Sequence, residues 1–110
     1  PLGPFITPAR AVADLGGPDV LLLRTMLNGQ TVQHDTVAHM VFSVFALIAD
    51  LSRGATLTPG TAILTGTPAG VGMARNPPRF LRAGDIVAVE IGTPDAPALL
   101  GRLENSVRAE

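Results

Sequence analysis

The residues of this chain best suited to contacting a small ligand lie in one short loop, residues 64–72, with the sequence LTGTPAGVG. Glycine allows a ligand to approach the backbone closely, and a threonine hydroxyl can hydrogen-bond to an oxygen of that ligand. Residue types alone leave two interpretations open. The loop forms either the rim of a binding pocket, with Thr67 as a contact residue, or a tight turn after a strand.

Nucleotide binding by this loop is excluded by its spacing. A phosphate-binding P-loop has the pattern G-x-x-x-x-G-K-[ST], because its lysine reaches the terminal phosphates. Here Gly66 and Gly70 are one residue too close, and no lysine follows them. A dinucleotide-binding G-x-G-x-x-G segment opens a helix, but no third glycine follows Gly72 at that spacing, and Pro77 and Pro78 come soon after.

The histidines and carboxylates show no catalytic or metal-binding pattern. His34 and His39 are five residues apart, whereas a metal-binding pair on a helix is spaced by three or four. A solvated or capping role is therefore expected for them. The nine acidic residues are scattered along the chain, and neither Ser43 nor Ser52 lies in a G-x-S-x-G segment. We predict no catalytic residue and no metal ligand in this chain.

Composition narrows the class of protein. The chain has 110 residues, of which 46% are hydrophobic, enough for one domain or part of one. A net charge of −1 gives no electrostatic footprint for nucleic acid or an anionic membrane. No apolar run approaches the roughly 20 residues of a membrane span. The chain has no cysteine, so disulfides are excluded and a cytoplasmic location is expected.

A hairpin and one helix are the clearest elements around the loop. The apolar run at 20–27 is followed by Asn28-Gly29, the favoured pair for a type I′ turn, and 30–33 returns as the second strand. One main helix is predicted over about 37–52, capped by Asp35 or Thr36. Its apolar stripe comprises Val37, Met40, Val41, Val44, Phe45, Ile48 and Leu51. Further apolar residues off this stripe predict a second buried face, against a subunit or against missing residues.

Short strands and turns account for the rest of the chain. Residues 1–8 are proline-rich and predicted to be extended, and 9–14 form a short strand or a single turn. A buried strand at 61–66 is expected to run into the glycine loop. Two later strands are predicted at 86–92 and 98–110, the second with a possible bulge at Gly101. The fold class is therefore mixed and mostly β, with the main helix packed on short strands.

Taken in order, several stretches closely resemble the C-terminal part of the fumarylacetoacetate hydrolase family. The resemblance covers essentially the whole chain, and the order of the pieces makes it specific. The pieces are PLGPFITP, LNGQTVQ, the apolar helix, LTPG, TGTPAGVG, FLRAGD and GRLENSV.

The resemblance implies a metal-dependent enzyme that acts on small 2-oxo or enol acids, with a β-rich roll and a homodimeric assembly. The reactions it implies are hydrolysis of C–C bonds, decarboxylation, hydration or isomerisation, as in the catabolism of aromatic compounds. The implied cofactor is a divalent metal, Mg²⁺ first, with Mn²⁺ or Ca²⁺ as alternatives. The metal would act as a Lewis acid toward the oxygens of the oxo acid.

The resemblance also implies that residues 1–110 are the C-terminal part of a single catalytic domain, inactive without its N-terminal half. The carboxylate metal ligands and the active-site lysine of the family are expected upstream of Pro1. The substrate-binding residues that it assigns here are Thr67 and Gly66. An alternative remains open, in which the chain belongs to a metal-free structural or assembly domain that kept the fold and lost the chemistry.

Overall fold

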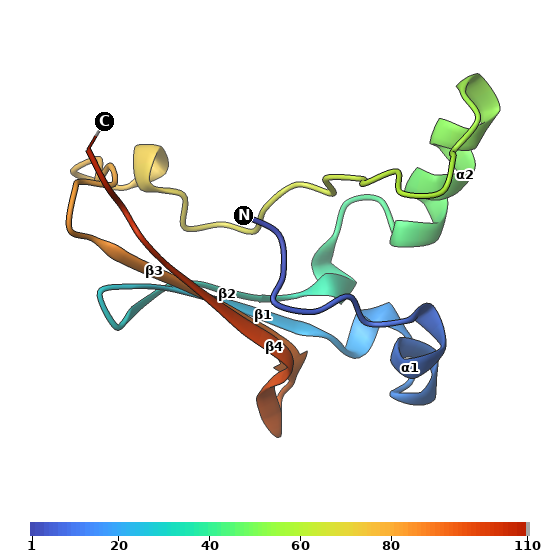
Figure 1. The fold of residues 1–110 in the computed structure, drawn as a ribbon, viewed down its shortest axis with the longest axis horizontal. Helices are drawn as coiled ribbons and strands as arrows, with labels where there is room; N and C mark the ends of the chain where they lie inside the picture. Colours follow the sequence, from blue (N-terminus) through green and yellow to red (C-terminus); the bar gives the residue numbers. More distant parts are fainter. Residues whose placement is uncertain (110) are drawn as a thin grey trace.

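A four-stranded antiparallel sheet forms the centre of the molecule (Figure 1). The structure, a computed structural model, describes residues 1–109. The strand order is β2-β1-β3-β4. The elements in chain order are α1 (Ala9–Asp14), β1 (Leu22–Leu27), β2 (Gln30–Thr36), α2 (Val44–Gly54), β3 (Ile86–Thr93) and β4 (Ala96–Ser106), with 3₁₀ turns at Pro18–Val20, Val37–His39 and Gly72–Ala74. The predicted class, mostly β with one main helix, is confirmed.

The β1–β2 hairpin turns at Asn28 and Gly29, as predicted. Both residues have positive φ, +51° and +81°, which is the requirement of a type I′ turn. The Asn28 side chain also ties the turn to the start of β3. Its Nδ2 donates to Asp85 Oδ1 at 2.8 Å, and its Oδ1 accepts from the Ile86 N–H at 2.8 Å.

The main helix begins at Val44, so the predicted start near residue 37 is wrong. Thr36 does act as a cap, accepting from the Ala38 N–H at 3.4 Å, but only for the short 3₁₀ turn. The Val37 N–H donates to the Leu21 carbonyl at 2.9 Å, which ties this turn to the entry of β1. Met40 then returns to extended backbone, and Ser43 supplies a second cap, accepting from the Ala46 N–H at 3.2 Å. Two caps in succession therefore divide the apolar stripe.

The segment between α2 and β3 contains no strand, so the predicted buried strand at 61–66 is wrong. Residues 61–71 are irregular, and the Leu64 side chain is 89% exposed. A strand needs a backbone ladder, and no strand of the sheet pairs with this segment. Near the N-terminus, residues 1–8, predicted to be extended, form no helix, and 9–14, predicted as a short strand or a single turn, form the short helix α1.

Gly101 borders an irregularity in the β3–β4 pairing. It lies opposite Ile91 with φ +128°, and the register shifts between Ile91 and Thr93. A Cβ on Gly101 would lie 3.3 Å from Pro4 and Phe5, so the glycine lets the N-terminal segment cross close over β4.

The core of the described residues is small. Leu21, Met26 and Ala88 are the only hydrophobic residues buried within it. The helix α2 stands away from the sheet instead of packing on it (Figure 1). Phe45 is 69% exposed, and Val41, just before the helix, is 90% exposed. The radius of gyration is 15.4 Å, above the roughly 13 Å of a compact domain of about 100 residues. Much apolar surface is therefore left uncovered within residues 1–109.

Candidate functional site

Thr67 of the glycine loop is joined to β2 by the side chain of Gln33. The Gln33 Nε2 donates to Thr67 Oγ1 at 2.8 Å and to the Pro68 carbonyl at 2.8 Å. Gln33 is not among the site residues predicted from the sequence. It lies 34 residues before Thr67, and no local motif links the two positions.

Two further contacts hold the loop against the same strand. Arg75 Nη2 donates to the Val32 carbonyl at 3.0 Å, and its Nε donates to the Gly70 carbonyl at 3.2 Å. Gly70 has φ +109°, and a Cβ there would lie 2.1 Å from the Val32 carbonyl oxygen. Only glycine therefore allows the loop backbone to lie so close to β2.

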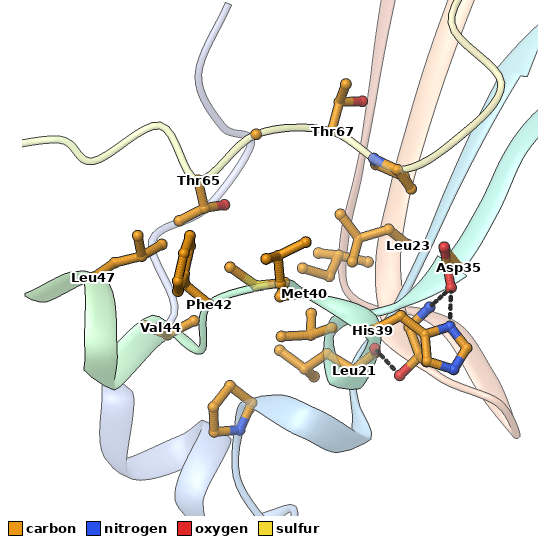
Figure 2. Close-up of a pocket in the computed structure, with 17 residues that line it drawn as sticks. Leu21, Leu23, Asp35, His39, Met40, Phe42, Val44, Leu47, Thr65 and Thr67 are labelled. Carbon is orange, nitrogen blue, oxygen red and sulfur yellow. Dashed lines mark hydrogen bonds and ion pairs between the residues drawn. The ribbon is translucent and has the colours of Figure 1, made fainter.

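The first half of the loop borders a cavity of about 450 Å³ (Figure 2). Leu23 and Ile91, paired across β1 and β3, lie on its sheet side. The segment before α2 and the helix itself supply Met40, Phe42, Val44 and Leu47, and the loop supplies Thr65, Gly66, Thr67 and Pro68. Thr65 and Thr67 lie across the cavity from Met40 in Figure 2. A mostly apolar cavity with a few polar groups at its rim is typical of a small-molecule site.

Both predicted substrate-binding residues, Thr67 and Gly66, line this cavity. Gly66 has φ +97°, in the region that glycine adopts readily, and it turns the backbone between the two threonines. Thr67 is exposed, and in Figure 2 its side chain points away from Met40 and Leu23, whereas that of Thr65 points toward the cavity. Of the two interpretations of the loop, this placement favours the pocket rim.

Asp35 and His39 form a polar pair at one end of the cavity (Figure 2). Asp35 Oδ1 lies 2.6 Å from His39 Nδ1 and accepts from the Thr36 N–H at 2.8 Å. The Thr36 backbone hydrogen bond first, and then His39, hold the pKa of Asp35 below its ordinary value. His34, on β2, is exposed and is not among the cavity residues.

Glu90 is the most buried charged residue of the described chain, at 4% exposure. It lies opposite Arg24 on β1 and opposite Arg102 on β4. Arg24 Nε donates to its Oε2 at 3.0 Å, and Arg102 Nη1 donates to its Oε1 at 2.7 Å. These hydrogen bonds, from Arg24 first, lower the pKa of Glu90 despite the opposing effect of burial. Through these two arginines, Glu90 joins β1, β3 and β4. Because both carboxylate oxygens already accept from arginine, we assign Glu90 a structural role and not a ligand-binding one.

Asp85 plays a similar part at the other end of the sheet. It accepts from Asn28 and from the Arg82 N–H, both at 2.8 Å, and from Arg79 at 2.9 Å. The Asn28 hydrogen bond is the main cause that lowers the pKa of Asp85. The FLRAGD turn is thereby fixed to the hairpin.

The residues described here do not fit a metal ion by themselves. Within residues 1–109, no group of three or more His, Cys, Asp or Glu side chains could hold one. Over the same residues, no helix is long and apolar enough to cross a membrane.

Comparison with known proteins identifies the family of this chain. The model of the fumarylacetoacetate (FAA) hydrolase C-terminal family matches residues 1–108. The chain is 44% identical over 107 residues to the mitochondrial oxaloacetate tautomerase fahd2 of Xenopus laevis, covering 97% of this chain and 31% of the relative. The chain therefore spans about a third of the length of this relative.

Solved structures show the same fold. A fumarylacetoacetate hydrolase from Exiguobacterium antarcticum matches with a TM-score of 0.76 and 38% identity, over 84% of this chain and 31% of that one. A maleylpyruvate hydrolase from Sphingobium sp. SYK-6 matches with a TM-score of 0.78 and 31% identity, over 96% and 34%. From its motifs, its sheet and these matches, the chain belongs to the fumarylacetoacetate hydrolase family.

Proposed function

We propose that this chain is part of a metal-dependent enzyme that acts on small 2-oxo or enol acids. The observation that carries the proposal is the position of Gly66 and Thr67, which both line the apolar cavity, with Thr67 exposed. The two residues would bind the polar end of the substrate, while the apolar walls exclude water from the rest. Relatives named as a tautomerase of oxaloacetate and as hydrolases of fumarylacetoacetate and maleylpyruvate support this substrate class.

The finer features of the whole protein belong to the same proposal. The metal is Mg²⁺, or else Mn²⁺ or Ca²⁺, bound by carboxylates outside residues 1–109, because the described part of this chain offers no such cluster. When bound, it would supply a Lewis acid for the oxo-acid oxygens. The reaction is an isomerisation, hydration, decarboxylation or C–C bond hydrolysis in catabolism. A cytoplasmic location also remains a prediction, and one relative is named as mitochondrial.

The exposed apolar surface on and just before α2 suggests a partner, for which there are two candidates. We propose that this surface packs against the N-terminal half of the same catalytic domain or against the second subunit of a homodimer. Phe45 and Val41 would then be buried in the complete protein, whereas here they are 69% and 90% exposed.

The same surface favours the alternative function, a structural or assembly domain without chemistry. Turnover separates the two candidates. The complete protein would be assayed with oxaloacetate and with acylpyruvates, with Mg²⁺ or Mn²⁺ and then after chelation. Turnover that is lost with the metal and restored by adding it back supports the enzyme. Assembly without turnover of either substrate, in the presence of metal, would favour the structural domain.

A further inference from the structure

The side-chain nitrogen of Gln33 contacts two oxygen atoms of the glycine loop, residues 64–72. Its Nε2 lies 2.8 Å from Thr67 Oγ1 and 2.8 Å from the Pro68 carbonyl oxygen. Each of the two amide hydrogens therefore has its own acceptor.

The chemistry of Pro68 decides which end of the amide faces the loop. The Pro68 carbonyl oxygen can only accept a hydrogen bond. If the amide of Gln33 were turned over, its oxygen would face this carbonyl oxygen, and the two acceptors would repel each other. The amide nitrogen must face Pro68. Because an amide nitrogen donates and does not accept, the same nitrogen must also donate to Thr67 Oγ1.

The direction of this hydrogen bond determines what Thr67 can offer to a ligand. One lone pair of its oxygen accepts from Gln33, so the hydroxyl proton points away from Gln33 and can donate to another acceptor. We infer that Gln33 is a positioning residue, which makes Thr67 a hydrogen-bond donor toward an acceptor oxygen of the ligand, a carboxylate or carbonyl oxygen. This inference rests on the proposed function, because it concerns the ligand that Thr67 binds.

The surroundings of the pair keep this geometry in place. Arg75 donates to the carbonyls of Val32 and Gly70, and Gly70 packs directly on Val32. Val32 immediately precedes Gln33, so these contacts join the strand and the loop right beside the Gln33–Thr67 hydrogen bond. None of these other contacts involves the Thr67 hydroxyl, so Gln33 alone accounts for its direction within the described residues.

A double-mutant cycle on the complete, metal-loaded protein tests the inference. The variants are Gln33→Met, Thr67→Val and the two together, with KM and kcat measured on oxaloacetate or an acylpyruvate. Gln33→Met is expected to raise KM about three- to tenfold, the range of one ordinary hydrogen bond, with kcat little changed. In the Thr67→Val background the same change should leave KM within about twofold, because Gln33 then has no hydroxyl to orient.

Each outcome has a distinct meaning. If the effects of Gln33→Met and Thr67→Val on KM are additive, Gln33 acts only by holding the loop through Pro68, and the inference is overturned while the role of Thr67 stands. If Thr67→Val alone leaves KM and kcat unchanged, Thr67 is not a substrate residue, and the proposed site and the inference fall together.

Two further variants test the direction of the Gln33–Thr67 hydrogen bond and control for the added charge. Gln33→Glu preserves the size of the side chain but makes it an acceptor that takes the Thr67 proton, so it should raise KM more than Gln33→Met does. An unchanged KM in Gln33→Glu would overturn the inference. Gln30→Glu places the same charge at an exposed position on the same strand and should leave KM within about twofold of the parent protein.

Discussion

Glu90 on β3 and Arg24 on β1 lie directly opposite each other, and Arg24 Nε donates to the buried carboxylate at 3.0 Å. Arg102 approaches the same carboxylate from β4. One charged side chain therefore joins β1, β3 and β4, and β1 and β3 supply Leu23 and Ile91 to the cavity.

Replacing Glu90 by Gln should destabilise the complete protein by about 1–3 kcal/mol, because two arginines lose a charged acceptor. A fall in the thermal unfolding midpoint measures this. Glu104→Gln is the matched control, since Glu104 is half exposed and pairs with Arg102. Equal midpoints for the two variants would show that Glu90 has no special structural role.

The lowered pKa values of Glu90 and Asp85 predict acid sensitivity. The unfolded chain takes up protons near the ordinary values of 4.5 and 3.8, whereas the folded chain takes them up at lower pH. Between the folded-state pKa and the unfolded-state pKa of each group, the unfolded chain binds more protons than the folded chain. The stability that these groups contribute is therefore fully present above about pH 5 and is lost as the pH falls. Midpoints should therefore stay level from pH 7 to about pH 5 and decline below it, and the midpoint of Glu90→Gln should decline less steeply. A parallel decline in both proteins contradicts this assignment.

The contact between Gly70 and β2 predicts a loss of activity on substitution. Gly70→Ala places a Cβ 2.1 Å from the Val32 carbonyl oxygen, so the loop and Thr67 must move. Displacing a binding group by about 1 Å can lower kcat/KM by a hundredfold, and a fall of at least roughly tenfold is expected here. Gly60→Ala is the control, because Gly60 also has positive φ, +89°, but no atom lies within 4 Å of its added Cβ. Similar losses in both variants would indicate backbone strain as the cause.

The exposed face of α2 allows a test of whether another part of the complete protein covers this helix. If Phe45 is covered in the complete protein, Phe45→Ala should cost about 3–5 kcal/mol of stability. If Phe45 stays exposed, as it is within residues 1–109, the cost should remain within about 0.5 kcal/mol. Arg53→Ala, on the same helix with a largely exposed side chain, provides the reference for a small effect. Thermal unfolding of the complete protein distinguishes the two cases.

The parts of the fold set by local chemistry could be predicted from the sequence. Asn28-Gly29 fixes a type I′ turn by itself, and Pro59-Gly60 and Ala83-Gly84 also form turns. The start of the helix could not be predicted, because Thr36 and Ser43 are both good caps. In the structure the first cap starts a 3₁₀ turn that is tied to the entry of β1 by the Val37 N–H and the Thr36 hydroxyl, contacts that depend on the folded chain.

Only the loop residues of the site could be predicted from the sequence. Thr67 and Gly66 lie in a recognisable motif, and both line the cavity. Gln33 has no local signature, because its partner is distant in the sequence and the contact exists only once the loop lies on β2. Burial of Glu90 likewise depends on the alignment of three strands, which no single segment encodes.

The measurement that tests the central proposal most directly is metal-dependent turnover by Thr67→Val in the complete protein. Thr61→Val is the matched control, because Thr61 is an exposed threonine of the same segment that is not among the cavity residues. With oxaloacetate or an acylpyruvate, Thr67→Val should raise KM or lower kcat at least several-fold, since a polar partner of the substrate is lost. Thr61→Val should match the parent protein. Kinetics of Thr67→Val that equal those of the parent protein would contradict the proposed site.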